Sequence, residues 1–120
     1  MTGLGTGVID FDGVLHSYTS GWKGEQEIPD PPTEGAVEWV EMITEAGYRA
    51  VVASTRAKEQ LGREAMALWL GRNGFPTLEI AYGKPPALWY VDDRAVRFPG
   101  PGRWPTLEEL REAAIPWNKR

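Results

Sequence analysis

Short apolar runs alternate along the chain with longer stretches in which apolar positions recur at helical spacing. The apolar runs predict five strands, at 7–10, 50–53, 77–81, 88–91 and 95–98. Helical spacing, together with a capping box at the start of the last stretch, predicts three helices, at 34–46, 58–73 and 106–114. Because strands that alternate with helices form parallel sheets, we expect an α/β fold.

The first two predicted helices each have an apolar face that would pack on the sheet. The faces comprise Val37, Val40 and Ile43 in the first helix, and Leu61, Ala65, Leu68 and Trp69 in the second. Thr33 is placed to cap the first helix, and Gly47 lies just past its end.

Acidic or hydroxyl side chains follow three of the predicted strands. They are Asp10 with Asp12, Ser54, and Asp92 with Asp93. In parallel α/β sheets, ligands bind beyond the carboxyl ends of the strands, so we expect these side chains to lie near one another. Paired carboxylates repel unless a cation or a proton intervenes, and hard oxygen ligands favour Mg²⁺.

Length and composition limit the classes of protein to consider. The 120 residues predict one domain, 1–120, and the hydrophobic share of 42% is ordinary for a globular chain. The net charge of -4 disfavours a long nucleic acid as partner, and there is no cysteine for a thiolate metal site. No apolar run approaches the ~20 residues of a membrane span and no signal peptide is evident, so we expect a cytoplasmic protein. Residues 3–7 are interpreted as a flexible leader.

The chain resembles the haloacid dehalogenase-like hydrolase superfamily, most of whose members are phosphatases. Four motifs of that family occur here in the family's order: Asp10-Phe11-Asp12-Gly13-Val14, Ser54 after an apolar strand, Lys84, and Asp92-Asp93. The resemblance covers most of the chain. It implies a three-layer Rossmann-like α/β sandwich with a central, mainly parallel sheet of about five strands and a short flap after the first strand.

The resemblance also implies a reaction, the Mg²⁺-dependent hydrolysis of phosphomonoesters through an aspartyl-phosphate. Asp10 would be the nucleophile, and Asp12 would act as general acid and then as general base. The carboxylate of Asp10, the backbone carbonyl of Asp12 and the carboxylate of Asp92 would bind the metal. Asp93 would bind it directly or through water, or would instead pair with a neighbouring arginine or a helix N-terminus.

Two further residues complete the implied site, each with a structural alternative. Ser54 would bind the phosphoryl oxygens, with Thr55 as its rival for that role, and either residue could instead cap the second helix. Lys84 would neutralise Asp10 and the transferring phosphoryl group, or would be an exposed loop lysine. Arg56 is interpreted as either a pocket residue or a solvated residue at a helix start.

The segment after the first motif contains His16 and Trp22. His16 is expected to pack or lie at the surface rather than act as a base. Trp22, in the flap, would either cover a substrate or pack in the core.

The intervals between the motifs are too short for the cap domain that many relatives carry. An uncapped site would admit a large phosphorylated substrate, such as a macromolecule. Alternatively, a second subunit of a homo-oligomer would close it. A nucleic-acid end remains a weaker candidate because of the acidic charge. The alternatives to a hydrolase are a non-catalytic phosphate- or metal-binding module and a phosphotransferase.

Overall fold

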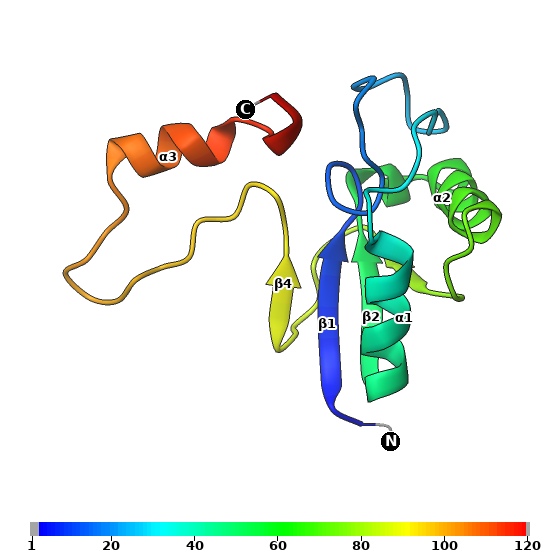
Figure 1. Ribbon diagram of the computed structural model, residues 1–120, viewed down its shortest axis with the longest axis horizontal. Helices are drawn as coiled ribbons and strands as arrows, with labels where there is room; N and C mark the ends of the chain where they lie inside the picture. The colour runs from blue at the N-terminus through cyan, green and yellow to red at the C-terminus, as the bar shows by residue number, and fades with distance from the viewer. Residues whose placement is uncertain (1–2, 120) are drawn as a thin grey trace.

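The fold is α/β, built on one parallel sheet of four strands. The computed structural model describes residues 3–119, and the strands, in the order β3-β2-β1-β4, run side by side as Figure 1 shows. Their bounds are Gly5–Asp10 for β1, Tyr48–Ala53 for β2, Glu79–Ala81 for β3 and Trp89–Val91 for β4. Each pair of neighbours is parallel, which confirms the predicted α/β class.

Three α-helices and two 3₁₀ turns complete the described chain. They are α1 (Ala36–Ala46), η1 (Thr55–Lys58), α2 (Gln60–Arg72), α3 (Leu107–Ala114) and η2 (Trp117–Lys119). The predicted capping box at the start of α3 is confirmed: the Thr106 hydroxyl accepts from the backbone N–H of Glu109, whose carboxylate reaches back. Within residues 3–119, no helix is both long and apolar enough to cross a membrane.

Helices α1 and α2 cover the same face of the sheet. Ile9 and Val52 from the sheet join one buried cluster with Val40 of α1 and Met66 of α2. The chain moves in one direction from β1 to β2 to β3, and right-handed crossovers then place both connecting helices on one side.

The opposite face is covered by a loop. The chain reverses direction between β3 and β4, so this crossover lies on the second face, and it consists of residues 82–88 with no helix. Ala87 of this loop packs on Val8, Val51 and Ala53. The expected three-layer sandwich is therefore corrected: within the described residues, one helical layer covers the sheet and a loop replaces the second.

Helix α3 does not add to the sheet's cover. Figure 1 shows it to the side of the sheet, beyond β4, and none of its residues is buried. After α3, η2 brings the chain back to the loop that follows β1, where the Trp117 indole N–H donates to the Gly13 carbonyl at 2.6 Å.

The strand predictions need two corrections. The fifth strand expected at 95–98 is wrong, because these residues lead away from β4 toward α3 and find no backbone partner among the described residues (Figure 1). The flexible leader is also wrong in part, because Gly5 and Gly7 belong to β1. Gly7 is required there, since the Trp89 ring occupies the space that a Cβ would need.

The helix faces were predicted well in α1 and poorly in α2. Val40 and Ile43 are buried as expected. In α2, Leu61 and Leu68 are 58% and 54% exposed. Trp69 is buried as predicted, and Met66 and Leu70 are buried beside it in place of Leu61 and Leu68. The inward face is shifted because η1 occupies the expected start of the helix.

The first helix also begins differently from the prediction. The N-cap position is taken by Gly35, in a left-handed conformation with no side-chain cap, and not by Thr33. Gly47 follows the helix as predicted, also left-handed, and its N–H bonds the last turn.

Candidate active site

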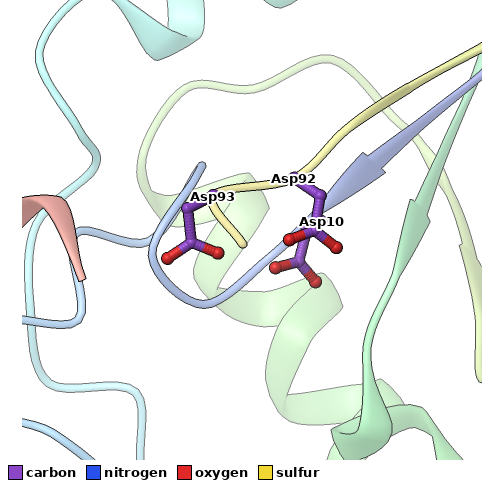
Figure 2. A group of neighbouring side chains, drawn as sticks. All are labelled: Asp10, Asp92 and Asp93. Carbon is purple, nitrogen blue, oxygen red and sulfur yellow. The ribbon is translucent and has the colours of Figure 1, made fainter. Parts of the chain in front are cut away.

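Three carboxylates meet at the carboxyl ends of β1 and β4. Asp10 is the last residue of β1, and Asp92 and Asp93 directly follow β4, the neighbouring parallel strand. One oxygen from each of the three lies within 4.8 Å of the others, and Figure 2 shows the side chains turned toward a common space. β1 and β4 are neighbours in the sheet, but the connection that leaves β1 and the one that enters β4 run on opposite faces. Ligands of α/β sheets bind at such a position.

The pKa values of these acids reflect their burial and their mutual repulsion. Burial, and then the nearby Asp92, raise the pKa of Asp10 to about 7. Burial and Asp92 also raise the pKa of Asp93. For Asp92 burial acts in the same direction, but hydrogen bonds from Lys84 and the Arg94 backbone N–H bring its pKa below the ordinary value. Two of the three acids therefore hold their protons more tightly than in water.

Lys84 contacts Asp92 rather than Asp10. Its ammonium group lies 2.5 Å from Asp92 Oδ2, and the Arg94 N–H donates to the other oxygen at 2.8 Å. The side chain is about half exposed. Lys84 thus offers one positive charge to three acids, from the edge of the cluster.

The triad has the donor set of a hard divalent cation. All the side-chain donors are carboxylate oxygens, with no histidine nitrogen or thiolate among them. A cation between them would offset the burial and the repulsion from Asp92 that together raise the pKa of Asp10 and of Asp93. Asp10, Asp92 and Asp93 are therefore the residues that fit Mg²⁺. The carboxylate of Asp12 is not in this cluster, so its predicted part through the backbone carbonyl stays a prediction.

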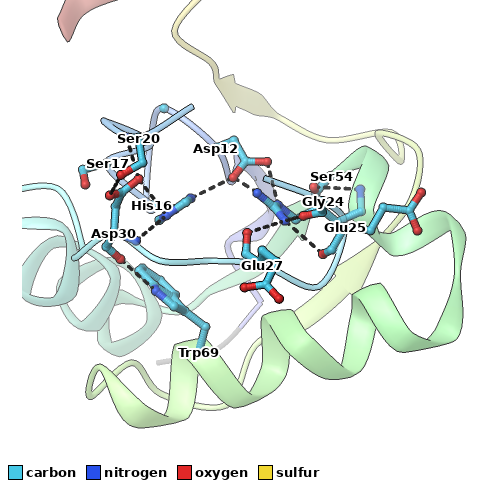
Figure 3. Close-up of polar contacts among 12 residues, drawn as sticks. Asp12, His16, Ser17, Ser20, Gly24, Glu25, Glu27, Asp30, Ser54 and Trp69 are labelled. Atoms are coloured by element: carbon cyan, nitrogen blue, oxygen red, sulfur yellow. Dashed lines mark hydrogen bonds and ion pairs between the residues drawn. The ribbon is translucent and has the colours of Figure 1, made fainter. Parts of the chain in front are cut away.

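Asp12 belongs instead to a buried hydrogen-bonded network (Figure 3). Arg56 Nε donates to both Asp12 oxygens, at 3.2 and 2.9 Å, and His16 Nδ1 lies 2.8 Å from Oδ1. The other end of Arg56 donates to three flap carbonyls, those of Gly24, Glu25 and Glu27. Arg56 is completely buried, and its bonds join the flap to the loop that follows β1.

The contacts of His16 define which of its nitrogens carries the proton. Nε2 lies 3.2 Å from the backbone N–H of Asp30, which can only donate, so Nε2 accepts. The proton is then on Nδ1 and is donated to Asp12. Asp30 is held in turn by Ser20 and, through its carbonyl, by the Trp69 indole N–H. His16 is buried, as expected, but it orients a predicted site residue.

These contacts keep Asp12 ionised. Burial would raise the pKa of Asp12, but hydrogen bonds from His16 and Arg56, with the positive charge of Arg56, hold it below its ordinary value. Asp12 therefore holds a proton less tightly than an ordinary aspartate does.

Ser54 caps the 3₁₀ turn η1 and not the second helix, whose N-cap position is taken by Glu59. Its hydroxyl accepts from the Arg56 backbone N–H at 3.1 Å and begins η1. Ser54 is buried while Thr55 is exposed, and both line the same cavity as the acids. Which of the two contacts a phosphate stays a prediction.

The predicted residues, except Lys84, share one cavity. It has a volume of about 450 Å³ and lies over the carboxyl ends of the strands. The predicted site residues in its wall are Asp10, Asp12, Ser54, Asp92 and Asp93. Other wall residues come from the flap and from 116–119.

Two residues of the site were not identified from the sequence. Arg56 was left undecided, although an arginine two residues after a strand-end serine was a usable signal. Trp117 carried none, because the Gly13 carbonyl that it bonds is 104 positions away.

No family model matches the chain, and neither a curated protein nor a solved structure matches it. What the protein does must therefore be inferred from the chemistry of its own residues.

Proposed function

We propose that the protein is a Mg²⁺-dependent phosphomonoester hydrolase of the haloacid dehalogenase-like type, with Asp10 as nucleophile. The observation that carries this proposal is the meeting of Asp10, Asp92 and Asp93 within 4.8 Å at the ends of two adjacent parallel strands. Asp12, a second acid in a different protonation environment, lies in the wall of the same cavity. The strand order and the crossover directions are those of a Rossmann-like sheet, which supports the assignment.

In this proposal Asp10, Asp92 and Asp93 hold the Mg²⁺. When bound, the ion offsets the negative charge of the acids and of the transferring phosphoryl group. Lys84 neutralises Asp92 from the outer side. The backbone N–H groups at the start of η1, with Ser54 or Thr55, bind phosphoryl oxygens.

In the first step a carboxylate oxygen of Asp10 attacks phosphorus. The bond between phosphorus and the ester oxygen breaks, and the leaving oxygen departs with the bonding electrons, which gives an aspartyl-phosphate. Asp10 must be ionised for this attack. Its pKa of about 7 therefore has to fall when the site is loaded.

In the second step Asp12 removes a proton from water. The water oxygen attacks phosphorus, the bond to Asp10 breaks, and inorganic phosphate leaves. The bonds from His16 and Arg56 keep Asp12 in the ionised form that this role requires. They oppose the earlier role as acid, for which Asp12 must first bind a proton. We therefore expect esters whose leaving groups depart unprotonated to react fastest.

The test is phosphate release from a panel of phosphomonoesters, including p-nitrophenyl phosphate, with Mg²⁺ and with chelator. We expect release that the chelator abolishes, and at least ~10⁴-fold slower turnover for Asp10→Asn, because removal of a nucleophile costs that much or more. Glu45→Gln, an exposed acid on α1, is the matched control and should leave turnover unchanged. Binding of Mg²⁺ and phosphate without release from any ester would favour the non-catalytic module. Phosphate passed to an added alcohol would identify a phosphotransferase.

A further inference from the structure

Aromatic side chains from separate segments line the cavity that holds the acids. They are Tyr18 and Trp22 from the flap and Trp117 from η2. Trp22 and Trp117 are 52% and 41% exposed, so folding leaves about half of each side chain uncovered. A phosphoryl group is bound by cations and N–H donors, so the exposed aromatic rings are not explained by phosphate binding.

Both tryptophans are nevertheless fixed in place. The Trp22 ring lies 4.7 Å from the guanidinium of Arg56, which is itself buried and hydrogen-bonded. Trp117 is held by its indole N–H, which donates to the Gly13 carbonyl at 2.6 Å. Each ring is thus anchored on the protein side and keeps surface available on the other. Such pre-ordered rings bind a planar group with little further loss of entropy.

Tyr18 adds an unusual backbone conformation at the same place. Within residues 3–119 it is the only non-glycine residue with positive φ, at +61°. Residues held in this region concentrate at ligand sites, where the surrounding structure imposes the strain. Its ring lies edge-on to His16, with 5.9 Å between centroids, so the strain places an aromatic group beside the Asp12 network.

The size and polarity of the cavity narrow the class of ligand. Its volume of about 450 Å³ lies in the range of small-molecule sites, roughly 300–1,000 Å³. Polar and cationic side chains stand in the wall beside the rings: Ser20, Thr55, Arg94, Asn118 and Lys119. A nucleobase has a π-face for the rings and donors and acceptors along its edge, whereas a phenyl ester has no such edge.

We propose that Trp117 and Trp22 bind the base of a nucleoside monophosphate while its phosphate lies at Asp10. This substrate class rests on the proposed function. Trp117 and Trp22 are then specificity-determining residues, and the segment 116–119 completes the wall that a cap domain would otherwise form. A single nucleotide also suits an acidic protein better than a polynucleotide does.

The test compares adenosine 5′-monophosphate with ribose 5-phosphate, which lacks only the base. We expect kcat/KM for the nucleotide to be at least about tenfold higher, since base stacking on aromatic side chains changes affinity by roughly 5- to 150-fold. Trp117→Leu should abolish most of this preference, because it should lower kcat/KM for the nucleotide several-fold more than kcat/KM for ribose 5-phosphate. Trp117→Phe, which keeps a ring, should retain part of it.

Trp104→Leu is the matched control. Trp104 is an exposed tryptophan that packs on Phe98 and is not in the cavity wall, so its loss should change neither ester. Equal kcat/KM for the two esters in the wild type would overturn the inference while leaving the hydrolase intact. Parallel loss of both activities in Trp117→Leu would also overturn it.

A calorimetric binding titration separates this inference from the proposed function. Asp10→Asn should bind the nucleotide more tightly than ribose 5-phosphate, and the difference should vanish when Trp117→Leu is added. If no ester is hydrolysed but this difference is found, the hydrolase proposal fails and the base site stands. If both esters bind equally, the base site fails whatever the outcome for turnover.

Discussion

Asp10 and Asp12 flank Phe11 in the sequence, and each belongs to a different cluster of side chains. The two clusters differ in how their negative charge is balanced. Asp10, Asp92 and Asp93 have one ion pair among them within residues 3–119, that of Asp92 with Lys84, and the pKa of Asp10 is raised. Asp12 has Arg56 and His16, and its pKa is lowered. The two clusters are drawn in Figures 2 and 3.

The difference indicates which acids the fold completes and which it leaves for a ligand. The Asp12 carboxylate is bonded by residues of the chain, although Arg56 Nη2, within the same network, is buried without a hydrogen-bond partner among the described residues. The Asp10 cluster is short of positive charge and gains most from an added cation. Asp12, whose charge the protein balances, and Asp10, which has no ion pair of its own, are thus two residues apart. In the proposed reaction this difference suits Asp12 for proton transfer and Asp10 for metal-assisted attack.

The largest expected effect on stability is that of removing the buried cation. Arg56→Met leaves Asp12 and the flap carbonyls without their donor, so we expect the free energy of unfolding to fall by about 3–5 kcal/mol. Urea unfolding followed by circular dichroism measures this loss.

Arg49→Met is the control for that substitution. Arg49 also pairs with a carboxylate, that of Glu79, but both side chains are exposed, and we expect a change of at most about 1 kcal/mol. Similar losses in the two variants would show that the Asp12 network is no more important than a surface ion pair.

A smaller, pH-dependent effect is expected in the other cluster. The pKa of Asp10 is about 7 in the folded protein and near 3.8 as the ordinary value. The folded state therefore holds this proton more tightly, and the stability that the proton contributes is present below pH ~4 and lost as the pH rises to about 7. With chelator, Asp10→Asn should raise the melting temperature by several degrees at pH 8 and much less at pH 4.

Magnesium provides the second half of this experiment. At pH 8 it should raise the melting temperature of the wild type and have little effect on Asp10→Asn, because binding to the folded state stabilises it. If the melting temperatures of the wild type and Asp10→Asn differed equally at pH 4 and pH 8, the pKa of Asp10 would not be raised in the folded protein.

The smallest expected effect, on Mg²⁺ affinity, concerns the contact between Gly13, in the loop that follows β1, and Asp93. A Cβ on Gly13 would lie 2.5 Å from Asp93 Oδ2, so Gly13→Ala should displace that carboxylate and weaken Mg²⁺ binding several-fold, with a stability loss of about 1 kcal/mol. Gly21→Ala has the same kind of positive φ but meets no atom within 4 Å. Calorimetric Mg²⁺ titrations that show equal weakening in both variants would assign the effect to backbone strain alone.

The sequence was sufficient to predict the parts of the site that depend on strand ends. Apolar runs identify β1, β2 and β4, and parallel pairing then brings Asp10 and Asp92 together. The pattern also predicted the α/β class, because a 3.6-residue period and continuous apolar runs differ locally. These are short-range features that a single segment contains.

What the sequence did not predict depends on contacts between distant segments. Arg56 looks like a solvated residue at a helix start until the flap carbonyls are placed around it. The phase of α2 was wrong because the 3₁₀ turn before it is set by the Ser54 cap and not by apolar spacing. The strand expected at 95–98 failed because β-pairing requires a neighbour, and apolar content alone does not supply one.

The bonds of Arg56 have a consequence for how a substrate enters. The same guanidinium holds the flap carbonyls of Gly24, Glu25 and Glu27 and the carboxylate of Asp12. Lifting residues 24–27 would break the three carbonyl bonds but not the bond to Asp12, because neither Arg56 nor Asp12 belongs to that segment. A substrate can therefore enter while Arg56 still holds the pKa of Asp12 below its ordinary value.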